Sequence, residues 1–169
     1  SIMPCTAKKG EAARDNLTQD GRPDVDIVLT VRELARLIRR GGLHLRDCEE
    51  SEFDTGLFTT GTGAAVIFGT TGGVMEAAVR TLYALTHGGE TLQPLVYTPA
   101  RGLEGVKESV VDLGDLGQVR LAIVHGMART QALIKKMAEH VVEYDFVEVM
   151  ACPGGCISGG GNPRLKNNY

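Results

Sequence analysis

Two short apolar runs on either side of a helical stretch constrain the fold of this chain more than any other feature. Residues 119–125 and 145–151 are mostly apolar and short, which is typical of buried strands. Between them, residues 128–140 place apolar side chains at helical spacing. A strand, a helix and a second strand in this order predict a right-handed parallel βαβ unit. The sequence therefore predicts an α/β fold.

Other segments extend this pattern to a mostly parallel sheet of about four strands that is flanked by helices. Further strands are expected where short apolar segments lie between turn residues, at 26–30, 95–98, 106–113 and in a segment that ends at Phe68. Thr30 and Glu33 have the spacing of a capping box, which predicts a helix that ends at Gly41. A second helix follows the glycines at 72 and 73.

The composition is that of an ordinary globular domain, with 43% hydrophobic and 23% charged residues. A net charge of −3 provides no basic surface for nucleic acid, and no apolar run reaches the ~18 residues of a membrane helix. The chain enters a motif at once, without a signal-peptide pattern, so we expect a cytoplasmic protein and a fragment or split subunit. We expect one lobe over residues 1–163 and a frayed tail at 164–169.

Three of the four cysteines lie in two motifs rich in proline and glycine. The predicted strand at 145–151 ends at Cys152, and Pro-Gly-Gly separates this thiol from Cys156. Strand ends in open α/β sheets are where ligands bind, and the glycines permit close approach of the backbone. Thiolates together with peptide N–H groups suit an iron–sulfur cluster, to which Cys5 would add a third ligand. Cys48, in a charged stretch, is expected to be a bystander.

The residues alone leave other interpretations open. The 152–156 segment is also compatible with a glycine-rich turn with incidental cysteines, or with a local disulfide. Three cysteines and His125 would suit zinc. The glycines at 69–73 precede a helix, where an anion can bind, but they match no nucleotide-binding motif, and close backbone packing is the plainer interpretation. Four arginines on the helix after Thr30 form either its solvated side or a docking patch for an acidic electron carrier, namely Arg32, Arg36, Arg39 and Arg40.

The two cysteine motifs resemble those of a known family. Residues 3–11 read MPCTAKKGE, and residues 148–163 read EVMACPGGCISGGGNP. They resemble the second and third cluster-binding signatures of the iron-only ([FeFe]) hydrogenases. Residues 55–56 and 67–78 also look like the catalytic domain of that family, so the resemblance covers nearly the whole chain. It implies one lobe of a two-lobed catalytic domain, whose first signature, TSCCP, would lie ahead of Ser1 and is absent.

The resemblance also implies roles for individual residues. Cys5 and Cys152 would ligate a [4Fe-4S] cubane, and Cys156 would bridge it to a two-iron subcluster, which together make the H-cluster. Lys8 would donate a charge-assisted hydrogen bond to a cyanide of that subcluster. The remaining residues that would line or adjoin the cluster are Met3, Pro4, Phe68, Met150 and Gly155.

The implied reaction is 2H⁺ + 2e⁻ ⇌ H₂, with ferredoxin or another carrier supplying electrons. The fourth cubane ligand and the last proton donor would come from the missing motif in an N-terminal portion. We therefore expect this chain alone to be inactive, and to expose an apolar face that favours self-association. Two alternatives are a non-catalytic iron–sulfur protein of the same fold that acts in cluster assembly, and a sensory module. The Thr6 and Ala7 pair after Cys5 favours hydrogenase ancestry over the assembly proteins.

Overall fold

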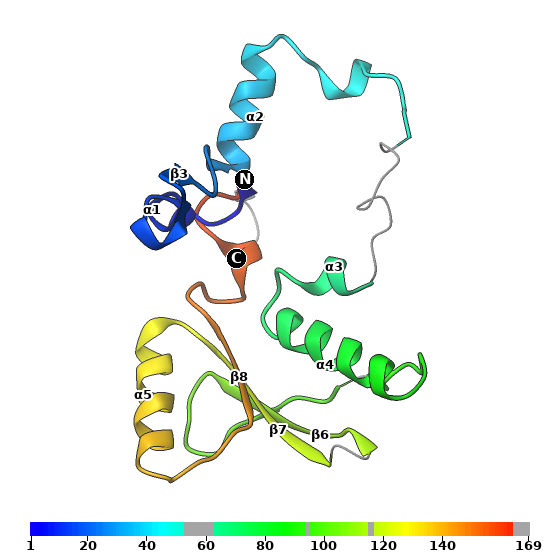
Figure 1. Ribbon diagram of the computed structural model, residues 1–169, viewed down its shortest axis with the longest axis vertical. Helices are drawn as coiled ribbons and strands as arrows, with labels where there is room; N and C mark the ends of the chain where they lie inside the picture. Colours follow the sequence, from blue (N-terminus) through cyan, green and yellow to red (C-terminus); the bar gives the residue numbers. More distant parts are fainter. Residues whose placement is uncertain (53–62, 94, 115–116, 164–169) are drawn as a thin grey trace. The chain divides into compact units, whose positions relative to one another are not determined.

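The computed structural model describes residues 1–52, 63–93, 95–114 and 117–163, which belong to two compact units (Figure 1). Unit 1 comprises residues 1–59 and 157–169, and unit 2 comprises residues 60–156. The hydrogenase-like segment at 55–56 and the tail expected at 164–169 lie outside the described residues. None of the described helices has the length and apolar character needed to cross a membrane.

Unit 2 is built on a four-stranded sheet with the strand order β5-β6-β7-β8. Its strands are β5 (Thr98–Pro99), β6 (Val106–Asp112), β7 (Gln118–His125) and β8 (Phe146–Met150). Its helices are α3 (Gly63–Ile67), α4 (Gly73–Thr86) and α5 (Met127–Ala138). The predicted α/β class with a four-stranded sheet and flanking helices is confirmed (Figure 1).

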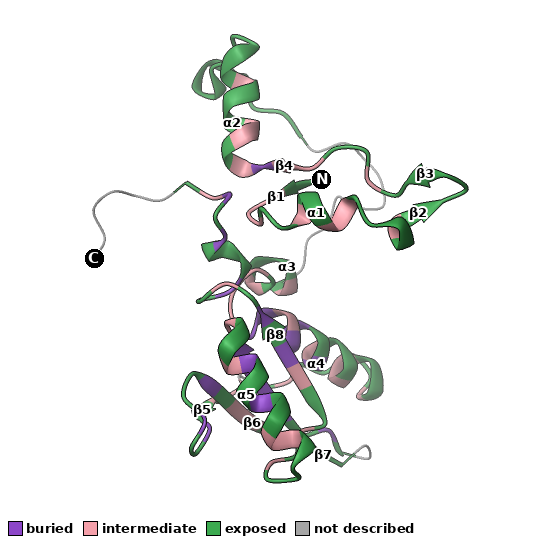
Figure 2. Cartoon of the chain, turned by 90° about the vertical axis from the view of Figure 1, so that its left-hand side faces the viewer, coloured by how far each residue is buried: buried purple, intermediate pink, exposed green. Residues whose placement is uncertain are grey.

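The core of unit 2 lies on both faces of β7. Met75 of α4 belongs to the cluster that contains Ile123, whereas Leu133 of α5 belongs to the cluster that contains Ala122 and Val124. Successive side chains of a strand point to opposite faces, so α4 and α5 cover opposite sides of the sheet. Figure 2 shows the buried residues gathered in this helix–sheet–helix sandwich.

Strand direction departs from the expectation of a mostly parallel sheet. The β7–α5–β8 unit is parallel, as predicted, but β5 with β6 and β6 with β7 are antiparallel. The physical reason is connection length: β6 and β7 are joined by residues 113–117, whereas a parallel crossover needs about a dozen residues or more. The prediction of mostly parallel pairing is therefore wrong.

The strand expected to end at Phe68 is also wrong, because residues 63–67 form the helix α3. Alanines at 64 and 65 favour a helix. Thr70 closes the turn after it, since its backbone N–H and its hydroxyl both donate to the Ile67 carbonyl, at 3.0 and 2.7 Å. Phe68 is 51% exposed, so it is not a core aromatic residue of unit 2.

Unit 1 is made of short elements around the N-terminus of one longer helix. Its two sheets are β1 (Ile2–Met3) parallel to β4 (Leu29–Thr30), and β2 (Thr18–Gln19) antiparallel to β3 (Arg22–Pro23). Its α-helices are α1 (Lys8–Ala12) and α2 (Val31–Arg40), and its 3-10 helices are η1 (Asp15–Leu17) and η2 (Leu45–Asp47). A further 3-10 helix, η4 (Cys156–Ser158), spans the boundary between the units. The strand expected at 26–30 is thus reduced to β4.

The predicted capping box at the start of α2 is confirmed. The Thr30 hydroxyl accepts a hydrogen bond from the Glu33 backbone N–H at 3.2 Å, and the Glu33 carboxylate accepts one from the Thr30 N–H at 2.9 Å. Lys9 adds an ion pair to the same carboxylate, with 2.9 Å between Nζ and Oε2. These contacts lower the pKa of Glu33 from 4.5 to about 2, chiefly through the hydrogen bond from the Thr30 backbone.

Acid titration should reveal the contribution of the Glu33 carboxylate to the stability of the fold. A pKa that is lower in the folded chain than in the unfolded chain means that Glu33 stabilises the fold above pH 4.5, and that this contribution is lost as the pH falls towards 2. We expect the melting temperature of the wild type to fall more steeply over this window than that of Glu33→Gln. Glu49→Gln removes the same charge from another exposed position and should follow the wild type. Parallel curves for the wild type and Glu33→Gln would contradict the assignment.

Candidate metal centre

In unit 2 the loop that carries Cys152 and Cys156 lies directly on the turn that precedes α4. The Thr71 N–H donates to the Gly154 carbonyl at 3.1 Å. Gly155 is buried at a φ of +99°, and a Cβ on it would lie 2.5 Å from the Thr71 nitrogen and 2.7 Å from the Gly69 oxygen. No residue with a side chain fits this position without displacing backbone. The turn at residues 69–73 thus packs closely against the backbone of the 152–156 loop and forms the seat of this loop.

A buried carboxylate joins β8, which delivers Cys152, to the same turn. Glu148 is 6% exposed, and its two oxygens accept hydrogen bonds from the N–H groups of Gly72, at 2.6 Å, and Met75, at 2.8 Å. The first N–H groups of a helix have no partner within the helix, so Glu148 caps α4 from a distant strand. Sequence analysis assigned it no role. The sequence signal for this capping role was an acidic residue inside an apolar strand. A carboxylate that is buried in such a strand needs hydrogen-bond or charge partners.

Two polar side-chain atoms beside this loop lack partners within the described part of the chain. The Thr71 hydroxyl oxygen and the His125 Nδ1 atom are buried without a hydrogen bond. His125 lies opposite Met150 in the β7/β8 register, and Met150 is 5% exposed. Buried polar atoms without partners are rare in folded proteins. Each atom therefore offers a hydrogen bond that a group bound next to it would use.

The thiols differ in exposure. Cys152 is half-buried and free, so the local disulfide that the sequence left open is not formed. Cys156 is exposed, and Cys48 is exposed and free. In unit 1, Cys5 is a half-buried free thiol shortly before α1.

Lys8 and Lys9 are both engaged in unit 1. Lys8 forms an ion pair with Glu11, with 2.6 Å between Nζ and Oε2, and the hydrogen bond it donates lowers the pKa of Glu11. Lys9 donates to the Val28 carbonyl at 2.8 Å in addition to pairing with Glu33. Each lysine of the motif thus has its own carboxylate partner.

The glycine tail of the third motif lies against the second motif in unit 1. The Gly161 N–H donates to the Pro4 carbonyl at 2.8 Å, and the Gly161 carbonyl accepts from the Arg32 N–H at 3.1 Å. Gly161 is buried, and a Cβ on it would lie 2.8 Å from the Pro4 oxygen and from Thr30 Cβ. Met3 pairs with Thr30 in the β1/β4 register. Unit 1 therefore brings residues of both motifs together at the start of α2.

The predicted site residues divide between the two units. Unit 1 contains Met3, Pro4, Cys5 and Lys8, and unit 2 contains Phe68, Met150, Cys152, Gly155 and Cys156. Among the described residues, no three His, Cys, Asp or Glu side chains lie together as a ready-made metal site. In chemistry, however, the residues of unit 2 suit an iron–sulfur cluster: two thiols, one loop with its backbone held close, and the unpartnered buried hydroxyl of Thr71 on the turn against which this loop packs.

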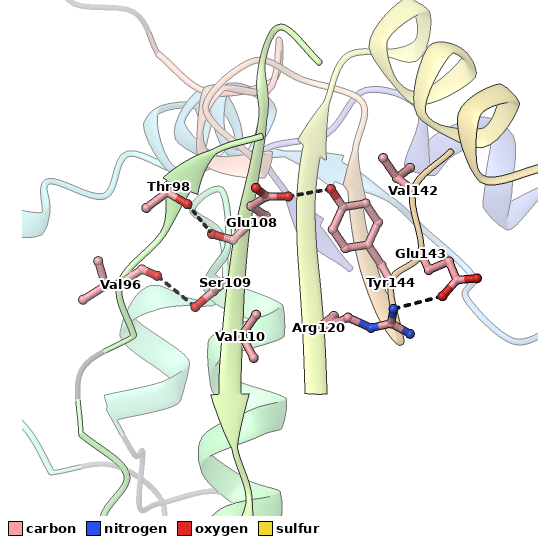
Figure 3. A pocket seen from close by; sticks show the side chains of 9 residues that line it. All are labelled: Val96, Thr98, Glu108, Ser109, Val110, Arg120, Val142, Glu143 and Tyr144. Carbon is pink, nitrogen blue, oxygen red and sulfur yellow. Dashed lines mark hydrogen bonds and ion pairs between the residues drawn. The ribbon is translucent and has the colours of Figure 1, made fainter. Parts of the chain in front are cut away.

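A separate open pocket of about 480 Å³ lies on the sheet of unit 2 (Figure 3). Within it the Tyr144 hydroxyl donates to Glu108 at 2.7 Å, and Arg120 donates to Glu143 at 3.0 Å. Burial, followed by the hydrogen bond to Glu108, raises the pKa of Tyr144 to about 12. None of the predicted site residues lines this pocket, so it belongs to a different part of the surface.

Comparison with known proteins identifies several relatives. The chain is 46% identical to the NADP-reducing hydrogenase subunit HndD of Solidesulfovibrio fructosivorans, over 96% of this chain and 27% of that protein. It is 42% identical to the periplasmic [Fe] hydrogenase large subunit of Nitratidesulfovibrio vulgaris, over 98% of this chain and 38% of that protein. It is also 32% identical to Protein NAR1 of Arabidopsis thaliana, over 98% of this chain and 37% of that protein. The chain thus spans about a quarter to two fifths of these relatives.

The fold agrees with these similarities. One solved structure, of an [FeFe]-hydrogenase in stepwise H-cluster assembly, matches this chain with a TM-score of 0.75 and 37% identity. The match covers 99% of this chain and 49% of the solved chain. Residues 1–160 match the family described as iron only hydrogenase large subunit, C-terminal domain. The chain therefore belongs to the iron-only hydrogenase large-subunit family.

Proposed function

We propose that this chain forms, over residues 1–163, one lobe of the catalytic domain of an iron-only hydrogenase, which interconverts protons, electrons and H₂. The observation that carries the proposal is the seat of the 152–156 loop. Gly155 packs its backbone against the 69–71 turn, so Cys152 and Cys156 stand at the two ends of a fixed segment. A fixed pair of thiols is what an iron–sulfur cluster requires of its protein.

In this proposal Cys5 and Cys152 bind the cubane, and Cys156 joins it to the two-iron subcluster. The H-cluster, when bound, supplies the redox chemistry of H₂. The protein binds it, orients it and excludes water. Lys8 would donate a hydrogen bond to the subcluster, for which its ammonium group must turn from Glu11 or be shared with it. The remaining lining residues are the thioethers of Met3 and Met150, the ring of Phe68, and the backbone of Pro4 and Gly155.

The proposed partners follow from the length of the relatives. Since this chain spans 27% and 38% of two hydrogenase relatives, we propose that a polypeptide portion N-terminal to it in the family supplies the fourth cubane ligand and the proton donor. Without that portion the chain would be inactive. Ferredoxin or a similar acidic carrier would deliver electrons under anaerobic conditions in the cytosol. The exposed arginines along α2 offer it a surface of opposite charge.

A second function has support of its own. The chain is also 32% identical, over 98% of its length, to a relative named cytosolic Fe-S cluster assembly factor narfl from Xenopus tropicalis, and this similarity favours a non-catalytic iron–sulfur role in the same fold, such as cluster assembly or sensing. The two proposals differ in the need for the two-iron subcluster. A hydrogenase lobe uses Cys156 and Lys8 for it, whereas an assembly protein needs only the cubane.

Anaerobic reconstitution of the chain with iron and sulfide tests the cluster directly. We expect about four irons per chain, with a cubane-type EPR signal after reduction. Cys5→Ser and Cys152→Ser should each lose most of this iron, whereas Cys48→Ser, the matched thiol control, should bind as the wild type does. A chain that binds one zinc and no iron, or equal loading in all three variants, would contradict the proposal.

A further inference from the structure

The 69–73 turn is held from two sides, and Glu148 provides one of the two attachments. On one side the Thr71 N–H donates to Gly154 in the cysteine loop, and on the other Gly72 and Met75 donate to Glu148 in β8. Glu148 lies in the same strand that leads to Cys152. Within unit 2 the turn therefore contacts both the strand and the cysteine loop, and the strand leads directly into that loop.

The carboxylate of Glu148 is charged and buried, yet only backbone N–H groups hydrogen-bond to it among the described residues. Burying a charge without hydrogen bonds is very costly, and the two short contacts, 2.6 and 2.8 Å, offset that cost. The positive end of the α4 dipole adds to the stabilisation. The negative charge therefore stays in a fixed position. Its field is felt by neighbouring groups: after burial and Glu76, it contributes to raising the pKa of Tyr97 to about 12.

We propose that Glu148 is a positioning residue for the cysteine loop, which it holds on the 69–73 turn while placing a fixed negative charge near any cluster that Cys152 binds. Removing the carboxylate would leave the turn tied to the loop by the single Thr71–Gly154 hydrogen bond and by the Gly155 contact. A negative charge near a cluster disfavours the addition of an electron and so lowers its reduction potential. This second effect rests on the proposed function, whereas the first does not.

Hydrogen exchange on the metal-free chain tests the attachment. In the wild type the Gly72 and Met75 amides should be protected, although N–H groups in the first turn of a helix usually exchange freely. Glu148→Gln keeps the shape but offers one acceptor and one donor group, so it can satisfy only one of the two N–H groups. We expect at least one amide to exchange about tenfold faster. Glu76→Gln, whose carboxylate pairs with Arg80 in the same turn, is the matched control and should leave both amides protected.

An EPR-monitored redox titration of the reconstituted chain tests the charge. We expect a more positive reduction potential in Glu148→Gln than in the wild type at equal iron content. A purely structural role would not produce this shift. An unchanged potential at equal loading would overturn the electrostatic part.

Unprotected Gly72 and Met75 amides in the wild type would overturn the positioning role even if Glu148→Gln fails to fold. A wild-type chain that binds no iron would overturn the electrostatic part together with the proposed function, and the exchange experiment would still decide the attachment.

Discussion

Replacing Gly155 by alanine should displace the cysteine loop and remove most of the cluster binding, although the three proposed ligand thiols are all intact. A Cβ at this position would lie 2.5 Å from the Thr71 nitrogen and 2.7 Å from both the Gly69 oxygen and the Thr70 carbonyl carbon. All three are backbone atoms, so a side-chain rotation cannot relieve the contact. Overpacking of this kind costs about 1 to 3 kcal/mol, and the φ of +99° adds a strain of about 1 to 3 kcal/mol for a residue with a Cβ.

Gly89→Ala separates the two contributions. Gly89 has a φ of +94°, but a Cβ there would meet no atom within 4 Å, so the variant carries the backbone strain without the clash. We expect Gly89→Ala to lower stability modestly in urea denaturation and to bind iron as the wild type does. Gly155→Ala should lose clearly more stability and most of its iron. Equal iron binding by Gly155→Ala and Gly89→Ala would show that the loop does not depend on its seat against the turn.

The features that the sequence predicted well are those encoded by neighbouring residues. The capping box needs only Thr30 and Glu33, and the contacts of both side chains are local. The parallel β7–α5–β8 unit follows from one apolar run, one helical period and a second apolar run. The motif around Gly155 likewise indicated close backbone approach, because the two glycines between the thiols permit it.

The features that the sequence did not predict depend on partners far away in the chain. The antiparallel pairing of β5, β6 and β7 is decided by short connections, which a search for apolar runs does not weigh. Residues 63–67 have no neighbouring strand to pair with in the described structure, and so helix propensity prevails. The hydrogen bonds of Glu148 join residues that are 73 and 76 positions apart. Nothing next to Glu148 in the sequence points to Gly72 or Met75.

The candidate site was predicted in part. Gly155 and the free thiol of Cys152 lie at a seated loop, as the motif suggested, and Gly161 joins the third motif to Pro4. The ligand roles of the thiols and the role of Lys8 stay predictions. They rest on the resemblance, since a cluster is bound by geometry among several segments and not by the spacing within one of them.

Replacing Gly161 by alanine should detach the glycine tail from the Pro4 segment and loosen the start of α2. Its Cβ would lie 2.8 Å from the Pro4 oxygen and 2.8 Å from two carbons of the buried Thr30. The same residue makes two backbone hydrogen bonds, to Pro4 and from Arg32, so the clash falls at a junction of three segments. We expect a loss of about 1 to 3 kcal/mol in the stability of unit 1.

The thiol next to Pro4 reports this change directly. Cys5 is half-buried, so an alkylating reagent should modify it faster in Gly161→Ala than in the wild type, whereas the exposed Cys48 should react at the same rate in both. Gly160→Ala is the matched control, because a Cβ there would meet only the Thr6 methyl group at an ordinary 3.8 Å. If Gly160→Ala and Gly161→Ala accelerate the reaction of Cys5 equally, the glycine tail is merely adjacent to the motif. If only Gly161→Ala does so, the tail holds Cys5 in place, which explains why a glycine occupies position 161.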